Sequence, residues 1–210
     1  MTIDTENTTN QPTKPRGRPL AFTHEAALDA ALQVFWTHGY EGTSMANLTT
    51  ALGMNKPSIY AAFGNKEALF LKVLDRYRAG PVAFVALSLD EPSAEKVAEK
   101  FLMGAVNFFA DPNTPNGCLI VQGALTCGPD ASAVQKLLIE YRKNLENALM
   151  NRFELAKLQG DLQVNVNTEH LAKYLITLHQ GLSVQASSGA SKASMLAVAE
   201  IGLANWATRD

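Results

Sequence analysis

The 210-residue chain has only two cysteines, Cys118 and Cys127, which are too few for a secreted disulfide framework and lack the spacing of a zinc site. No uninterrupted apolar run reaches the 18 or so residues that a membrane span requires, and residues 1–16 are polar, without the apolar core of a signal peptide. With 18% charged and 47% hydrophobic residues, the chain can bury a sizeable core unaided. We therefore expect a cytoplasmic protein with no membrane partner, no cofactor and no bound metal.

The formal net charge of −2 is divided unevenly along the chain. Residues 12–80 contain eight Lys or Arg against five Asp or Glu, whereas residues 81–210 contain ten against thirteen. The basic segment is the candidate surface for a polyanion such as a nucleic acid.

Sustained alternation of apolar and polar residues, which is typical of strands, is also missing. Apolar residues recur instead with a period near 3.6, and segments rich in Gly, Pro, Asn and Asp separate the periodic stretches, as at residues 111–117 and 127–130. This pattern predicts an all-α protein of about nine helices.

Four of these helices are predicted in the first 80 residues, over 23–38, 44–52, 56–63 and 66–78. The second ends at Gly53, and the third follows Asn55 and has Pro57 in its first turn, where a missing N–H costs nothing. Two helices joined by three residues, 53–55, form a helix-turn-helix. A short helix with polar tips and nearby cations fits the major groove of DNA.

Three runs in this region carry a family resemblance: GYEGTS at 39–44, LGMNKPSIY at 52–60 and FGNKEALF at 63–70. Together they resemble the DNA-binding head of the TetR family of transcriptional repressors. The resemblance implies a homodimer whose helical C-terminal part binds a small molecule that releases double-stranded operator DNA. It divides the chain into a tail (1–15), a helix-turn-helix DNA-binding domain (16–65), a connecting helix (66–80) and a C-terminal effector-binding and dimerisation domain (81–210).

The resemblance also assigns roles to single residues of the head. Tyr60, Lys66 and Thr43 would contact phosphates, and Lys56, Pro57 and Ser58 would lie nearest the base edges. Ser44 and Asn55 begin the two motif helices, whose backbone N–H groups favour phosphate. Arg16 and Arg18 flank a glycine ahead of the first helix. They form either a minor-groove arm or a solvated basic tail.

The C-terminal part contains many large apolar residues, most of which are expected to pack in the core. A cavity between helices is the usual place for a small ligand in a helical domain. Polar residues on these apolar helices are the better indicators of such a cavity. The residues predicted to contact an effector are Phe101, Phe108, Cys118, Gln122, Tyr141 and His179.

Two alternatives concern the thiols and the histidine. Cys118 and Cys127 are either inert buried thiols or the sensor of a metal- or thiol-responsive regulator. An all-helical enzyme would need Cys118, Cys127 or His179 to act with Glu140 or Glu146, but no recognisable local arrangement of nucleophile and base is present.

The end of the chain carries two apolar stripes, one over 171–182 and one over 196–206. They either pack within the chain, serve a protein partner, or pair with a second copy in a four-helix bundle. We expect the homodimer, because two heads about 34 to 36 Å apart would contact two half-sites on DNA. The predicted dimer residues are Leu171, Leu175, Leu178, Leu182, Leu196, Leu203 and Trp206.

Overall fold

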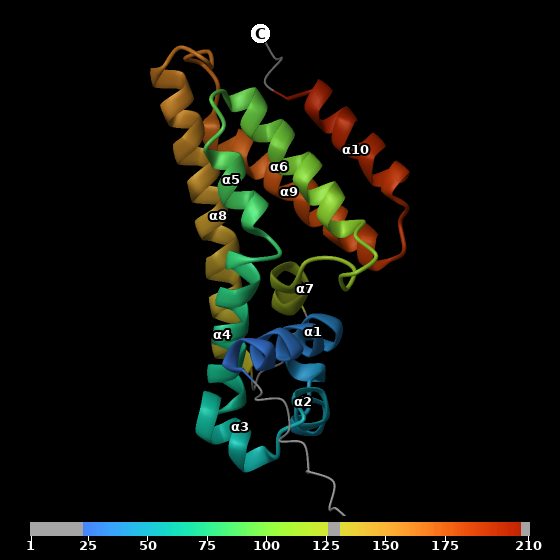
Figure 1. Cartoon of the computed structure of the whole chain (residues 1–210). Helices are drawn as coiled ribbons and strands as arrows, with labels where there is room; N and C mark the ends of the chain where they lie inside the picture. Colours follow the sequence, from blue (N-terminus) through green and yellow to red (C-terminus); the bar gives the residue numbers. More distant parts are fainter. Residues whose placement is uncertain (1–22, 126–130, 207–210) are drawn as a thin grey trace, which may run out of the picture.

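The computed structural model describes residues 23–125 and 131–206, which form ten helices and no strand (Figure 1). The helices are α1 (His24–Gly42), α2 (Met45–Leu52), α3 (Lys56–Phe63), α4 (Lys66–Ala79), α5 (Ala83–Leu89), α6 (Ala94–Phe109), α7 (Leu119–Leu125), α8 (Ser132–Leu158), α9 (Thr168–Ser187) and α10 (Lys192–Ala204). The prediction of an all-α protein is confirmed. Among the described residues there is one helix more than the nine expected.

Local capping explains the boundaries of the first four helices. The Thr23 side chain accepts a hydrogen bond from Ala26 N at 3.1 Å, as an N-cap residue should. Gly39, with φ of 70°, interrupts the helical geometry of α1 close to the predicted end of the first helix. Gly53 ends α2 in the left-handed conformation, with φ of 61°. These signals lie within a few residues of the helix ends, so they could be read from the sequence.

The short helix α5 has no side-chain cap and only seven residues. A segment of this length completes barely two turns, so it carries no clear apolar stripe. This explains why the sequence did not predict it as a separate element.

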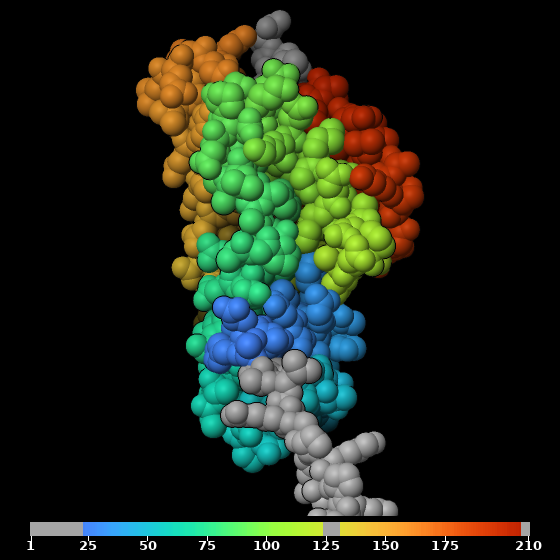
Figure 2. Space-filling model, viewed as in Figure 1, coloured from blue at the N-terminus to red at the C-terminus, as the bar shows by residue number. Residues whose placement is uncertain are grey.

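The molecule is elongated, with α1, α2 and α3 gathered at one end and α6, α8, α9 and α10 packed together toward the other (Figures 1 and 2). The small end, which we call the head, has an aromatic core. In it, Phe35 meets Phe70 edge-on at a centroid distance of 5.0 Å. Because Phe35 belongs to α1 and Phe70 to α4, α4 is an integral part of the head as well as its connection to the rest of the chain.

Two further contacts connect α1 to α4 and to the loop before α7. Arg76 of α4 forms a two-pronged ion pair with Asp29 of α1, with both N–O distances at 2.8 Å. The buried Trp36 indole donates a hydrogen bond of 2.9 Å from Nε1 to the Gly117 carbonyl, just before α7. The head is therefore joined to the C-terminal helices both along the chain and through this tertiary bond.

None of the helices within residues 23–125 and 131–206 combines the length and the apolar character needed to cross a bilayer.

Candidate nucleic-acid interface and ligand cavity

The helix-turn-helix presents α3 at the free end of the head (Figure 1). Asn55 caps this helix, because its Oδ1 accepts a hydrogen bond from Ser58 N at 2.9 Å. Ile59 and Phe63 are buried and anchor α3 to the head core. The anchors leave the opposite side of the helix free to meet a ligand.

The exposed side of α3 carries the residues predicted to meet DNA. Asn55, Lys56, Pro57, Ser58 and Tyr60 are all exposed, and the Tyr60 side chain is 41% accessible. The Lys56 ammonium lies 5.7 Å from the centre of the Tyr60 ring, so one turn of helix presents a cation beside an aromatic hydroxyl.

Helix starts add backbone donors to this surface. Ser44 is exposed and forms a capping box with Asn47, in which the Ser44 Oγ accepts from Asn47 N at 3.1 Å and the Asn47 Oδ1 accepts from Ser44 N at 2.9 Å. Asn65 caps α4 by accepting a hydrogen bond from Ala68 N at 2.8 Å. The starts of α2 and α4 are thus both capped helix N-termini that favour an anion.

Lys66, next to Asn65, is only half-exposed. Its ammonium lies 4.4 Å from the centre of the Tyr40 ring. Burial lowers the pKa of Lys66, and the nearby Glu41 carboxylate partly offsets this effect by raising it. The Lys66 ammonium is thus positioned over a ring beside the start of α4.

Thr43 does not fit its predicted role. Its side chain is fully buried, and its hydroxyl donates a hydrogen bond of 2.7 Å to the Gly39 carbonyl. The hydroxyl is therefore committed to the turn between α1 and α2 and is not free to bind a phosphate. Arg16 and Arg18 lie outside the described residues.

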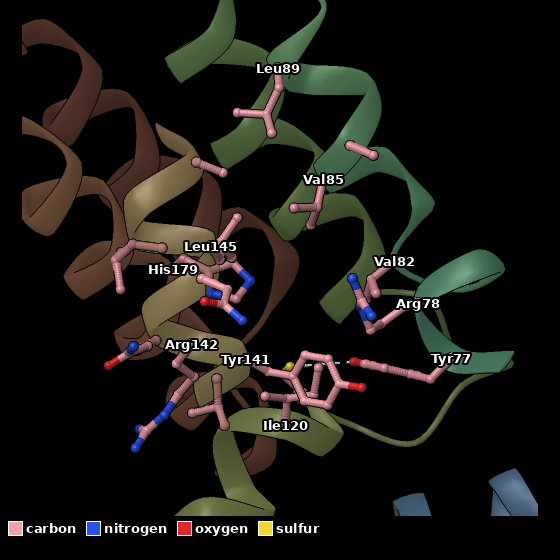
Figure 3. A pocket seen from close by; sticks show the side chains of 17 residues that line it. Tyr77, Arg78, Val82, Val85, Leu89, Ile120, Tyr141, Arg142, Leu145 and His179 are labelled. Carbon is pink, nitrogen blue, oxygen red and sulfur yellow. Dashed lines mark hydrogen bonds between the residues drawn. The ribbon is translucent and has the colours of Figure 1, made fainter. Parts of the chain in front are cut away.

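A second candidate site is a cavity of about 270 Å³ in the C-terminal part. Four elements and the start of α7 enclose it (Figure 3): the end of α4, α5, the middle of α8 and the middle of α9. Its wall is mostly apolar, with Val82, Val85, Ile120, Leu145 and Ile176 among the residues that form it. A partly open cavity with a mostly apolar wall and a few polar side chains is typical of a small-molecule site.

The polar groups of this cavity differ in their hydrogen bonding. The Tyr77 hydroxyl donates to Cys118 Sγ at 3.4 Å. The buried His179 imidazole stacks on Phe101 at a centroid distance of 5.2 Å and has no hydrogen-bond partner among the described residues. Burial lowers the pKa of His179 to about 4, so the ring is neutral at physiological pH.

Comparisons with known proteins give the same family throughout. The sequence pattern of the bacterial regulatory proteins, tetR family, matches residues 27–73. The HTH-type transcriptional repressor ComR of Escherichia coli (strain K12) is 35% identical over 195 residues, which cover 92% of this chain and 93% of ComR. The chain belongs to the TetR family.

Other TetR-family proteins extend the likeness to the whole fold. The E. coli HTH-type transcriptional repressor BdcR is 29% identical over 91% of this chain and 92% of BdcR. The structure of a cysteine mutant of the TetR family transcriptional regulator CifR, complexed with 26-base-pair double-strand operator DNA, matches with a TM-score of 0.84. That match has 39% identity and covers 90% of this chain and 100% of the CifR chain. This TetR-family chain is thus a DNA-binding transcriptional repressor.

Three of the six predicted effector residues line the cavity: Cys118, Tyr141 and His179. The other three predictions are wrong for this cavity. Phe101 is fully buried behind His179, and Phe108 packs between Trp36 and Phe84. The Gln122 amide, on α7, donates to the Asn116 carbonyl at 3.0 Å, so this side chain bonds to the loop before α7 and does not line the cavity.

The residues predicted to form the dimer interface are not the most exposed apolar residues of the TetR-family chain. Leu175, Leu182 and Trp206 are buried within the chain itself, with 0%, 2% and 5% of their surface accessible. The remaining four are half-buried and pack against the same core; they are Leu171, Leu178, Leu196 and Leu203. The large apolar residues that α9 and α10 expose are instead Val184 and Val198, each 44% accessible, and Ile201, at 65%.

The alternatives that involve catalysis or metal find no assembled site. Glu140 is exposed on α8, and Glu146 pairs with Lys173 at 3.5 Å, so neither carboxylate lines the cavity with Cys118 and His179. Across the described part of the chain no three potential ligands gather around a metal position. Burial raises the pKa of the Cys118 thiol, more than the Tyr77 hydrogen bond lowers it. Its partner Cys127 lies outside the described residues.

Sequence reasoning missed two features of this site. Arg78 and Arg142 line the cavity although they are 64 positions apart in the sequence and lie on different helices, so no local pattern connects them. The bond from Trp36 to Gly117 was missed for the same reason. The only available signals were a large aromatic residue in a small head and a glycine that follows Pro115 and Asn116.

Proposed function

We propose that this TetR-family repressor acts as a cytoplasmic homodimer and that a small molecule in the cavity of the C-terminal part releases it from its operator. The single observation that supports ligand-induced release from DNA is the position of α4. Its residues Phe70 and Arg76 hold the head together, whereas Tyr77 and Arg78 line the cavity. A ligand in the cavity therefore touches the last turn of the helix that supports the head.

Contacts between α4 and α1 explain how a ligand in the cavity could affect the head. The Tyr77 ring meets the Trp36 ring edge-on at 4.9 Å, and Trp36 belongs to α1. Displacing α4 by a ligand moves both of these rings. The size of the shift is bounded by the difference between the ligand's affinities for the DNA-binding and the released states.

In the head, we assign phosphate contacts to Tyr60, Lys66 and the N-termini of α2 and α4, and base contacts to Lys56, Pro57 and Ser58. Phosphate contacts position a protein on DNA, whereas contacts to base edges select the sequence. The support for this division is that α3 turns its short polar side chains outward near its N-terminus while Ile59 and Phe63 hold its other side.

For the dimer, we assign the outer side of the packed pair α9 and α10, because α9 exposes Val184 and α10 exposes Val198 and Ile201. α10 runs along the edge of the molecule in Figure 2. Two copies of this helix pair would form a four-helix bundle that removes these side chains from water.

The DNA-binding roles can be tested on a site selected from random duplexes with the purified protein. Tyr60→Phe and Lys66→Gln should weaken binding to all sequences and reduce the dependence of affinity on salt, because each removes a phosphate contact. Ser58→Ala and Lys56→Gln should instead change the preferred sequence. Equal losses on selected and random DNA for all four variants would contradict the assignment.

The cavity can be tested with a filling substitution. Ala148 lines the cavity on α8, and Asn147 beside it is exposed, so Ala148→Trp fills the cavity and Asn147→Trp is the matched control. In a thermal-shift screen of small molecules, compounds that stabilise the wild type and release DNA should lose both effects with Ala148→Trp only. Compounds that act equally on Ala148→Trp would place the effector elsewhere.

A further inference from the structure

Two arginines line the cavity, Arg78 and Arg142, and neither pairs with a carboxylate among the residues that the structure describes. We propose that the effector is a small organic anion, an apolar molecule with one carboxylate group that pairs with Arg78. This inference rests on the proposed role of the cavity as the effector site, and it adds the chemical class of the ligand.

The first step is the balance of charge around the cavity. Arg78 and Arg142 both line it, and none of its lining residues within the described ranges is Asp or Glu. An uncompensated positive charge beside an apolar space favours a ligand that brings the negative charge with it.

The second step compares the arginines of the described chain. Arg76 is paired with Asp29, and Arg152 donates to the Leu89 and Glu91 carbonyls at 3.2 and 2.7 Å. Arg78 and Arg142, by contrast, form no hydrogen bond or ion pair with any described residue. Their donors are available to an incoming acceptor, and a guanidinium binds a carboxylate through two parallel hydrogen bonds.

The third step selects Arg78 as the group that holds the carboxylate. Its guanidinium carbon lies 4.7 Å from the centre of the Tyr141 ring, so α8 holds the cation in place while the N–H groups at its edge stay free. In Figure 3 the Arg78 side chain points into the space between α4 and α8, whereas the Arg142 side chain points outward. Arg142 thus adds to the positive potential without a direct contact.

The size and chemistry of the inner space limit the rest of the ligand. A volume of about 270 Å³ is equivalent to roughly nine water molecules at about 30 Å³ each, so a ligand with a single ring or a short branched chain fits. Val85 and Ile176 would contact its apolar body. At the opposite wall from Arg78, the neutral His179 ring offers one donor and one acceptor to a further polar atom (Figure 3).

The test uses matched acids and neutral amides as probes: benzoate with benzamide, and 3-phenylpropionate with 3-phenylpropionamide. Binding is measured by calorimetry and thermal shift on the full chain at millimolar probe concentrations. The wild type should bind each acid at least about tenfold more tightly than its amide, because the charged pair adds to a shared apolar contact.

The variants identify the residue responsible. Arg78→Gln should lose at least about tenfold in affinity for the acids and leave the amides unchanged. Arg78→Lys should retain part of the preference for acids. Lys143→Gln is the matched control because it removes one positive charge from an exposed position beside Arg142. Circular dichroism and the melting temperature establish that each variant is folded.

The outcomes separate this inference from the proposed function. Equal binding of acids and amides, no binding of any acid, or equal losses in Arg78→Gln and Lys143→Gln would overturn the anion proposal. If neutral compounds release DNA and lose this effect in Ala148→Trp, the cavity is the effector site but the ligand class is wrong. If acids bind through Arg78 and DNA stays bound, the anion site stands and the role in release fails.

Discussion

Single side chains in the cavity owe their chemistry to burial. His179 is only 6% accessible and lies between the rings of Phe101 and Phe109, where a charged imidazolium would lose its hydration. Cys118 is similarly enclosed, at 4% accessible, and burial raises the pKa of its thiol. Both groups are therefore neutral at physiological pH, so the cavity wall carries its formal charge on the arginines.

The buried histidine predicts a pH dependence of stability. The pKa of His179 is about 4 in the folded chain and 6.5 in the unfolded chain, so below pH 6.5 the unfolded state takes up the proton and the folded state does not. Stability is lost as the pH falls from 6.5 to 4. His179→Phe keeps a ring between Phe101 and Phe109 and removes the titration.

This dependence is measured by urea unfolding of both proteins between pH 7 and pH 4. The stability of the wild type relative to His179→Phe should fall by about 3 kcal/mol over this range. Taking the difference between the two proteins removes the contribution of the carboxylates that they share. A difference that does not change with pH would show that the folded imidazole takes up its proton normally.

At the scale of the element, α3 combines a capped start with an exposed polar side. Asn55 contributes to both properties, because its side chain accepts a hydrogen bond from Ser58 N and the residue is exposed at the proposed DNA surface. A substitution that removes the cap would change stability and DNA binding together. The two effects must therefore be separated by a second variant.

Asn55→Ala should lower the free energy of unfolding by about 1 kcal/mol, because it removes the cap acceptor. Asn55→Asp keeps an acceptor at the same place and suits the positive end of the helix, so its stability should stay near that of the wild type. Its negative charge should nonetheless reduce operator affinity, and more strongly at low salt. Normal operator binding by Asn55→Asp would place this helix start away from DNA.

The contact between α1 and the loop before α7 gives a second prediction for elements. Trp36→Phe loses the bond to the buried Gly117 carbonyl and should cost about 1 to 3 kcal/mol of stability. Tyr174→Phe is the control, since it loses a hydrogen bond of 3.1 Å to the Gly202 carbonyl, between α9 and α10. Operator affinity should change in Trp36→Phe alone. Equal changes in both variants would mean that the bond from Trp36 carries no signal to the head.

At the scale of the whole molecule, the proposed function depends on a homodimer, in which two copies would place two heads on one DNA site. Ile201 is 65% accessible on the outer side of α10, and an arginine there would be buried without a partner in the proposed interface. Ile201→Arg should therefore shift the protein toward monomers in sedimentation analysis and weaken its binding to the full operator.

The matched control for this prediction is Leu158→Arg. Leu158 is an even more exposed apolar residue, at 86%, and lies at the last turn of α8, outside the proposed interface. This variant should remain a dimer. A monomeric Leu158→Arg together with a dimeric Ile201→Arg would move the interface from α10 to the end of α8.

The sequence contained enough information for the fold class, the family, the limits of the first four helices and the exposed residues of α3. Caps, turn glycines and apolar period act between residues a few positions apart, so they can be read along the chain. Asn55 and Gly53 illustrate this, because each does in the structure what its local pattern indicates.

Only the tertiary structure shows which helix packs on which face of its neighbours. A periodic stripe shows that Leu175 and Leu182 share one side of α9, but not that the same chain buries that side and leaves Ile201 exposed on α10. Packing likewise brought Arg78 of α4 and Arg142 of α8 to one cavity. Such contacts depend on the relative positions of several helices. They cannot be predicted from patterns among residues that are close in the sequence.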